Sequence, residues 1–267
     1  MKHARLGDLE VLSHAPASPA RATPLLFVHG AYAGAWCWAE NFLPYFAEAG
    51  YASYAVSLRG HGGSRGREAL DTLSIDDYVC DVREVAAALP QAPVLIGHSM
   101  GGLVVQKYLE HTAAPAVVLM ASVPPHGLMT SALELAFSNP GLMRDLNRLL
   151  GGAQVALDTL REAMFAQPVS SQRLHSYYLL MQPESHRAIW DMTLFNLPLI
   201  HRMHRPPLLI LGAEHDHLIP AAQVAVTART YGVDAEIFPG FGHGMMLERD
   251  WRKVAEHMRL WLAQHGI

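Results

Sequence analysis

Three side chains in this sequence, Ser99, Asp216 and His243, are of the types that carry out nucleophilic catalysis, and each follows a short apolar run. A serine hydroxyl is a poor nucleophile unless a base removes its proton, and that base must be oriented by a third group. Histidine commonly serves as the base, and a carboxylate serves as the orienting group. The order serine, acid, histidine along the chain therefore predicts acyl transfer through Ser99.

The candidate nucleophile lies in the sequence GHSMG (97–101), between the apolar run 94–96 and a segment of helical spacing that starts at Leu103. A serine at a sharp strand-to-helix turn has strained backbone, and the glycines on either side let neighbouring chains pass. The same pattern occurs at GGSRG (62–66), but no apolar strand enters that loop and no apolar helix leaves it. The context selects Ser99 and makes Ser64 an ordinary loop serine.

The candidate acid and base both lie in loops that follow predicted strands. Asp216 comes after the apolar run 208–211, and His243 comes after the run 235–238. Glu214 is a rival for the acid, but it lies closer to its strand, so Asp216 is preferred. We expect His243 to accept the proton of Ser99 and Asp216 to hold its imidazole.

Backbone amides beside these loops could stabilise a developing negative charge. His29 and Gly30 follow the apolar run 25–28, and a glycine there lets the backbone approach the site closely. We assign the two oxyanion donors to the N–H groups of Ala31 and Met100, and we expect His29 to brace the loop. The residues expected to contact the substrate are Gly30, Tyr32, Trp38, His98, Met129 and Met245.

The elements that must position these residues can be read from hydrophobic patterning. Short apolar runs rich in β-branched or aromatic residues predict buried parallel strands at 25–28, 53–56, 94–96, 116–120, 208–211 and 235–238. Segments of helical spacing separate them, at 42–49, 75–89, 103–111, 221–231 and 251–264. Strand alternating with helix predicts an α/β fold with a doubly wound, mostly parallel sheet.

The alternation stops between about residues 123 and 204, where the sequence predicts consecutive short helices separated by proline and glycine. We therefore predict a core domain of residues 1–122 and 205–267 and an inserted helical cap, or lid, of residues 123–204. The insertion contains half of the 12 methionines. They are either fillers of a core or the walls of an apolar pocket beneath the cap.

Composition excludes several classes of protein. The chain has 267 residues, of which 51% are hydrophobic and 16% charged, so it is not disordered. Its formal net charge of −4 gives no basic surface for nucleic acid. Its apolar runs are far shorter than the ~20 residues that span a bilayer, so we expect no membrane partner.

Other features set expectations for location and ligands. No apolar stretch follows the first basic residues, and the two cysteines do not form a disulfide framework, so we expect a reducing, cytoplasmic location. His215 and His217 flank Asp216 without a partner cluster of ligand spacing, so no metal site is predicted. The expected assembly is a monomer or a homodimer.

Five blocks of this sequence resemble the α/β-hydrolase superfamily in kind and order. They are FVHGAYAGAWCW (27–38), SLRGHGGS (57–64), IGHSMGG (96–102), LGAEHDHLIP (211–220) and GFGHGMMLE (240–248). The first block is similar to the branch of small esterases, plant methylesterases and hydroxynitrile lyases. The resemblance implies an eight-stranded sheet, a helical cap and no metal or organic cofactor.

Departures from related enzymes favour ester hydrolysis. The lyases of that branch carry lysine after the catalytic histidine and lack the glycine of the His-Gly pair, whereas this sequence has Gly244 and Gly30. We predict a serine carboxylesterase that acts on small to medium apolar esters. The alternatives are a cofactor-free lyase or oxygenase that uses His243 as a base, a lactonase or carbon–carbon bond hydrolase, and a non-enzymatic ligand receptor.

Overall fold

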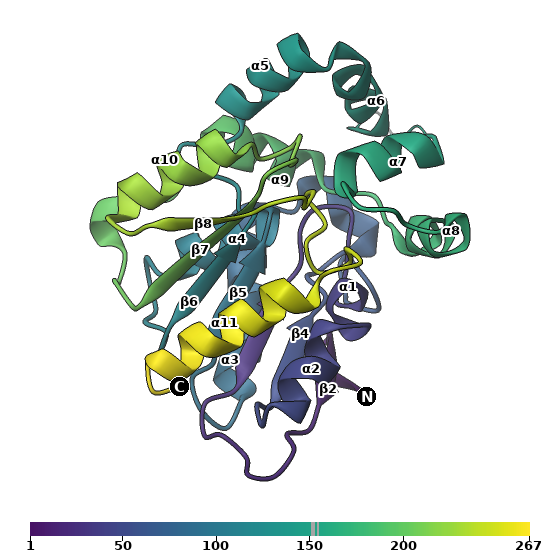
Figure 1. Ribbon diagram of the computed structural model, residues 1–267. Helices are drawn as coiled ribbons and strands as arrows, with labels where there is room; N and C mark the ends of the chain where they lie inside the picture. Colours follow the sequence, from purple (N-terminus) through teal and green to yellow (C-terminus); the bar gives the residue numbers. More distant parts are fainter. Residues whose placement is uncertain (151–152, 154) are drawn as a thin grey trace.

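The centre of the molecule is an eight-stranded sheet in the order β1-β2-β4-β3-β5-β6-β7-β8 (Figure 1). This computed structural model describes residues 1–150, 153 and 155–267. The strands are β1 (Lys2–Leu6), β2 (Leu9–His14), β3 (Leu25–Val28), β4 (Ser53–Val56), β5 (Val94–His98), β6 (Val117–Met120), β7 (Leu208–Ala213) and β8 (Ala235–Phe238). Only the pairs that include β2 are antiparallel among these strands, so the predicted doubly wound, mostly parallel sheet is confirmed.

Helices cover both faces of the sheet because successive strand residues point to opposite sides. In β3, Leu25 and Phe27 pack with α1 (Trp36–Ala39), α2 (Phe42–Glu48) and α11 (Arg252–Gln264). Leu26 and Val28 pack on the other face with α3 (Ile75–Ala88), α4 (Met100–Tyr108) and α10 (Ala221–Tyr231). The two hydrophobic clusters make the sheet a rigid platform for the loops at its carboxyl edge.

The N-terminal hairpin is an element that the apolar runs did not predict. β1 and β2 pair through a two-residue turn at Gly7 and Asp8, with Leu6 opposite Leu9. Most of β1 is exposed, so its sequence KHARL lacks the continuous apolarity used to find the buried strands. The Gly-Asp pair with positive φ at Gly7 is the turn signal that could have indicated the hairpin.

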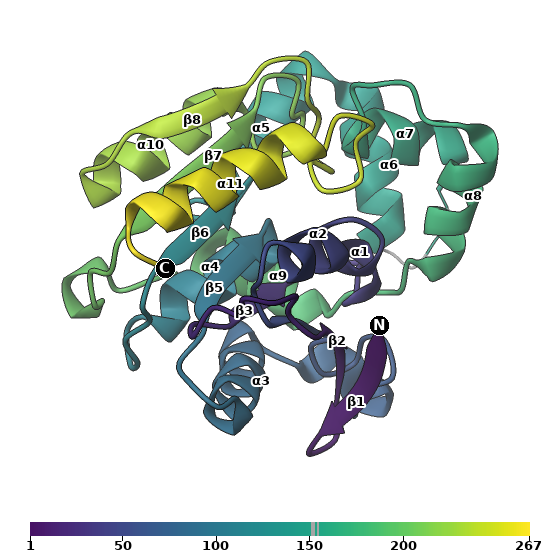
Figure 2. The ribbon, with the colours of Figure 1, turned by 60° about the horizontal axis from the view of Figure 1, so that its bottom comes forward.

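Between β6 and β7 the chain forms helices that gather at one end of the sheet (Figures 1 and 2). They are α5 (Met129–Ser138), α6 (Pro140–Leu150), α7 (Leu157–Met164), α8 (Ser171–Leu180) and α9 (His186–Trp190). A short π-helix, Asp191–Phe195, and a short 3₁₀-helix, Ile200–Arg202, follow α9. A 3₁₀-helix, Arg67–Thr72, precedes α3. None of the described helices combines the length and apolarity needed to cross a bilayer.

Candidate active site

Ser99 occupies a sharp turn between β5 and α4, and its backbone is strained, with φ of 53° and ψ of −121°. A Cβ at Gly97 would overlap the backbone of Gly101 and Gly102. At Gly101, a Cβ would overlap the Val28 and His29 carbonyl oxygens. The two glycines of the motif therefore let the start of α4 pack directly against β5 and the end of β3.

The candidate acid and the candidate base lie in the loops after β7 and β8 and contact each other. Asp216 Oδ2 accepts a hydrogen bond from His243 Nδ1 at 2.8 Å, and both side chains are buried. Asp216 Oδ1 accepts from the backbone N–H groups of Leu218 and Ile219, each at 2.8 Å. These bonds fix the carboxylate, so the proton of His243 is held on Nδ1 and Nε2 is left to act as a base.

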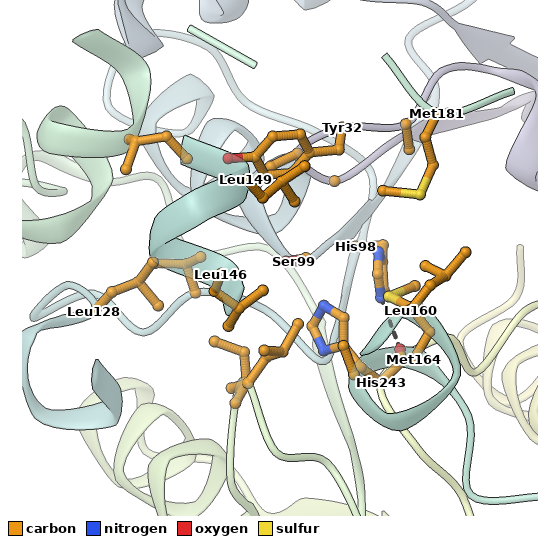
Figure 3. Close-up of a pocket in the computed structure, with 18 of the residues that line it drawn as sticks. Tyr32, His98, Ser99, Leu128, Leu146, Leu149, Leu160, Met164, Met181 and His243 are labelled. Carbon is orange, nitrogen blue, oxygen red and sulfur yellow. Dashed lines mark hydrogen bonds between the residues drawn. The ribbon is translucent and has the colours of Figure 1, made fainter. Parts of the chain in front are cut away.

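Ser99 and His243 line one cavity, in which Figure 3 shows both residues beside His98. In the part of the chain that the structure describes, the Ser99 hydroxyl has no hydrogen-bond partner. Catalytic hydrogen bonds are often long in ligand-free enzymes and tighten when substrate binds. Among the described residues, His243 is hydrogen-bonded to Asp216 and not to the rival acid Glu214, which accepts a hydrogen bond from the Gly240 amide at 2.8 Å.

His98 contacts the loop that carries His243. Its Nε2–H donates to the backbone carbonyl of His243 at 2.9 Å, and the two ring centroids are 4.6 Å apart. Burial lowers the pKa of His98 well below its ordinary value, so the ring stays neutral. His98 therefore positions the loop that carries His243, and its ring also lines the cavity.

The expected oxyanion loop lies against the nucleophile. A Cβ at Gly30 would come within 2.9 Å of Ser99 Cβ, so only glycine fits without displacing the serine. His29 Nδ1–H donates to the Gly30 carbonyl at 2.8 Å, and His29 Nε2 accepts from Leu58 N–H at 3.0 Å. Burial lowers the pKa of His29 to about 3, which keeps this neutral tautomer.

The hydrogen bond from His29 Nδ1–H to the Gly30 carbonyl orients the peptide between Gly30 and Ala31. The peptide unit is planar and trans, so its C=O and N–H groups point in opposite directions. Because His29 holds the Gly30 carbonyl, the Ala31 N–H is directed away from His29. Among the described residues, neither this N–H nor that of Met100 has a hydrogen-bond partner. Both amides are free to bind an oxyanion.

The cavity above Ser99 has a volume of about 280 Å³ and mostly apolar walls. Figure 3 shows Leu128, Leu146 and Leu149 with Tyr32 on one side of Ser99, and Leu160 and Met164 near His243. No Asp, Glu, Lys or Arg side chain is found among the described lining residues. Such a cavity fits an uncharged, largely apolar group.

Of the residues predicted to contact substrate, Gly30, Tyr32 and His98 line this cavity, and three others do not. Trp38 is fully buried in the core, where its ring centroid lies 4.9 Å from that of Phe27. Met245 is likewise buried in the core, and its neighbours Met246 and Leu247 face the cavity instead. Met129 starts α5 with 39% of its surface exposed. Sequence position did not reveal the direction in which these side chains point.

The methionines of the inserted segment divide between the two expected roles. Met143, Met164, Met181 and Met192 line the cavity, whereas Met203 packs against the core. Four of the six therefore contribute flexible apolar surface to the cavity walls.

One buried carboxylate near the site, Glu184, was not identified from the sequence. It lies in the inserted segment yet accepts a hydrogen bond from the backbone N–H of Tyr32, in the loop that follows β3. The only local signal was a lone acidic residue between Pro183 and Ser185, which does not distinguish a buried carboxylate from a solvated one. The predicted loop serine, Ser64, is structural: its hydroxyl donates to the Ser57 carbonyl at 2.5 Å.

Comparisons with known proteins identify the family and the fold. Residues 25–257 match the model of the Alpha/beta hydrolase family. A non-heme chloroperoxidase from Burkholderia pyrrocinia is 27% identical over 263 aligned residues, which cover 85% of this chain and 87% of that protein. Methylesterase 3 from Arabidopsis thaliana is 34% identical over 85 residues, covering 31% of this chain and 32% of the relative.

Among solved structures, an esterase from Exiguobacterium antarcticum superposes with a TM-score of 0.73 at 21% identity. The superposition covers 97% of this chain and 96% of that esterase. At this identity the likeness shows that the two chains share a fold.

Proposed function

Because the chain belongs to the alpha/beta hydrolase family, we propose that it is a serine carboxylester hydrolase for small to medium apolar substrates. The observation that carries this proposal is the buried Asp216–His243 hydrogen bond, set in the same cavity as the strained Ser99 turn. We further propose that residues 123–204 act as the cap and that residues 1–122 and 205–267 form the core domain.

In this mechanism Ser99 Oγ attacks the acyl carbon while His243 Nε2 removes the hydroxyl proton. The N–H groups of Ala31 and Met100 bind the negative oxygen that forms. His243 then gives its proton to the leaving alcohol, and the acyl group remains on Ser99. A water molecule deprotonated by His243 hydrolyses that ester and releases the acid, and Asp216 stabilises the charged imidazole in both halves.

The proposal is tested by following hydrolysis of p-nitrophenyl esters from acetate to decanoate and by trapping the acyl-enzyme. We expect turnover with a chain-length optimum. Mass spectrometry after rapid acid quenching should show the acyl mass on the peptide that contains Ser99. Absence of both turnover and label across the whole ester series would contradict the esterase assignment.

The apolar wall predicts how acyl length is limited. Leu146 lines the cavity, so Leu146→Trp should fill part of it and lower kcat/KM for octanoate relative to acetate by about tenfold. Leu133, also in the insertion, is 54% exposed and lies outside the lining, so Leu133→Trp is the matched control. Equal chain-length profiles for the two variants would show that the acyl group does not occupy this cavity.

A second candidate is a reaction without acyl transfer, in which His243 acts as a base in a cofactor-free lyase or oxygenase. It is favoured by the non-heme chloroperoxidase relative, whose name denotes chemistry other than ester cleavage. Lactone or carbon–carbon bond hydrolysis would use the same machinery as the esterase. Turnover that survives in Ser99→Ala would identify the non-acyl reaction.

A further inference from the structure

The segment that joins α8 to α9 is attached directly to the oxyanion loop. The Gln182 backbone N–H donates to the Tyr32 carbonyl at 3.0 Å, and Gln182 Oε1 accepts from the Gly62 amide at 2.6 Å. Two residues later, Glu184 Oε2 accepts from the Tyr32 N–H at 3.4 Å. Both polar groups of the Tyr32 backbone are therefore held by the inserted segment.

Tyr32 needs such support because its backbone is strained. Its φ is 62°, a left-handed conformation that non-glycine residues rarely adopt. Strain of this kind persists only where surrounding contacts fix the backbone. Tyr32 directly follows Ala31, whose N–H is the proposed oxyanion donor, so a change at Tyr32 would rotate that donor.

Glu184 is a buried carboxylate with an unusual set of partners. Its Oε1 accepts from the Tyr78 hydroxyl at 2.6 Å and from the Ser185 N–H at 2.8 Å. His61 Nε2 lies 3.2 Å from Oε2 in an ionic contact that is not aligned as a hydrogen bond. Among the described residues, no Lys or Arg pairs with Glu184, so His61 supplies its counter-charge.

The charged forms of Glu184 and His61 stabilise each other. Burial opposes the charged forms, but the His61 ring lowers the pKa of Glu184, and the Glu184 carboxylate raises the pKa of His61. The His61 ring lies 5.2 Å from that of His29, and its charge adds to burial in lowering the pKa of His29. Neutral His29 is the form whose Nε2 can accept from the Leu58 N–H while its Nδ1–H donates to the Gly30 carbonyl. Glu184 is thus linked to the peptide between Gly30 and Ala31 by its hydrogen bond with the Tyr32 N–H, and it contacts His61, whose ring lies beside His29.

We propose that Glu184 is a positioning residue that holds the Ala31 amide in line with the developing oxyanion. The proposal rests on the proposed function, because it concerns the same acyl-transfer site. It assigns the inserted segment a part in transition-state stabilisation in addition to lining the cavity. Glu184 itself does not touch the substrate, since it does not line the cavity.

The test compares two buried carboxylates of the inserted segment. In Glu184→Gln, the amide NH₂ must face either the Tyr32 N–H or the donors from Tyr78 and Ser185. Asp191 is fully buried and accepts from Ile75 N–H at 3.2 Å and Arg187 Nε at 2.9 Å, so Asp191→Asn creates the same conflict away from the oxyanion loop. Both variants should be less stable than the wild type.

The two variants should differ in catalysis. For p-nitrophenyl butyrate, Glu184→Gln should lower kcat about tenfold with KM nearly unchanged, less than the 10²–10³-fold cost of losing an oxyanion donor. The inhibition constant of a trifluoromethyl ketone, which binds as an oxyanion adduct, should rise by a similar factor. Asp191→Asn should leave both values within about twofold of the wild type.

Each outcome decides a different point. If the wild type hydrolyses no ester, the proposed function fails. If the wild type is active and Glu184→Gln changes only its melting temperature, as Asp191→Asn does, Glu184 is merely structural and the inference is overturned. A rise in KM without loss of kcat would also overturn it, because that pattern indicates weakened ground-state binding.

A pH profile provides an independent test through His61. The groups that face it are Glu184, His29, Tyr78 and Arg67, together with the Arg59 carbonyl. Burial raises the pKa of Tyr78 far above its ordinary value, and His29 has a pKa of about 3. Of these groups, His61 is therefore the one that loses its proton as the pH rises above the ordinary histidine pKa of 6.5.

As the pH rises through the raised pKa of His61, the ring loses its proton and Glu184 is left buried without its counter-charge. The stabilisation from this pair is present below the ordinary histidine pKa of 6.5 and is lost above the folded-state value. We expect kcat of the wild type to fall on this alkaline limb and the limb to be absent in His61→Gln. An identical alkaline limb in His61→Gln would contradict the coupling.

Discussion

Replacing Ser99 with alanine is expected to lower kcat for p-nitrophenyl butyrate by at least about 10⁴-fold, to a rate near that of the oxyanion site alone. The change removes only the hydroxyl that would form the acyl-enzyme. Alanine keeps the Cβ that packs near Gly30, so the strained turn should remain folded. The measurement is kcat and KM at pH 7.5, together with a thermal melt for each protein.

Ser64→Ala is the matched control, because Ser64 occupies the centre of the second G-x-S-x-G match in this chain. Its hydroxyl donates to the Ser57 carbonyl and accepts from the Glu10 N–H at 2.9 Å, so its loss should reduce stability. The folded variant should keep its turnover within about threefold of the wild type. Undiminished hydrolysis by Ser99→Ala would disprove acyl transfer through this serine.

Asp216→Asn is expected to lower kcat by about 10³–10⁴-fold without a large change in KM. The two oxygens of Asp216 accept three N–H groups, from His243, Leu218 and Ile219. If the amide oxygen of asparagine keeps the two backbone bonds, its NH₂ group faces His243 Nδ1. The imidazole must then carry its proton on Nε2, where it cannot accept the proton of Ser99.

Glu214→Gln tests whether the neighbouring acid contributes. Glu214 is exposed and bonds to the Gly240 amide, so turnover should stay within about twofold of the wild type. A large loss in Glu214→Gln with little loss in Asp216→Asn would transfer the orienting role to Glu214. The pair of variants thus separates two carboxylates that lie two residues apart in one loop.

The hydrogen bonds between the inserted segment and Tyr32 should couple substrate specificity to the catalytic rate. Met181 lines the cavity, and the next residue, Gln182, bonds to Tyr32. Substitutions in this connection therefore affect both the shape of the cavity and the geometry of the oxyanion donors. Changes of specificity made there should alter kcat as well as KM, whereas changes at Leu146 should alter mainly chain-length preference.

Apolar patterning and local motifs predicted most of the sheet and the order of the chemical groups. Buried parallel strands are continuous apolar runs, so β3 to β8 could be placed within one or two residues. The Ser99 turn was identified because its requirement for glycines on both sides is local. Asp216 and His243 followed from their positions after strands, because parallel strands bring their carboxyl ends to one edge of a sheet.

Local sequence patterns did not predict the exposed strand or the direction in which two side chains point. The β1–β2 hairpin was missed because β1 is an exposed edge strand without an apolar run. Trp38 and Met245 were expected at the cavity but belong to the core, and Met246 lines the cavity in place of Met245. Neighbouring residues in a loop point in different directions, and the loop's path is set by packing with distant segments.

The contacts between the inserted segment and the core depend on long-range packing, which the sequence patterns do not show. Glu184 lies 152 residues from Tyr32 in the chain, and no periodicity or motif connects the two. Their contact exists because the α8–α9 connection packs against the loops after β3 and β4, where burial removes water and requires every polar group to find a partner. The sequence determined which groups could perform the chemistry, whereas long-range packing decided which groups hold them in place.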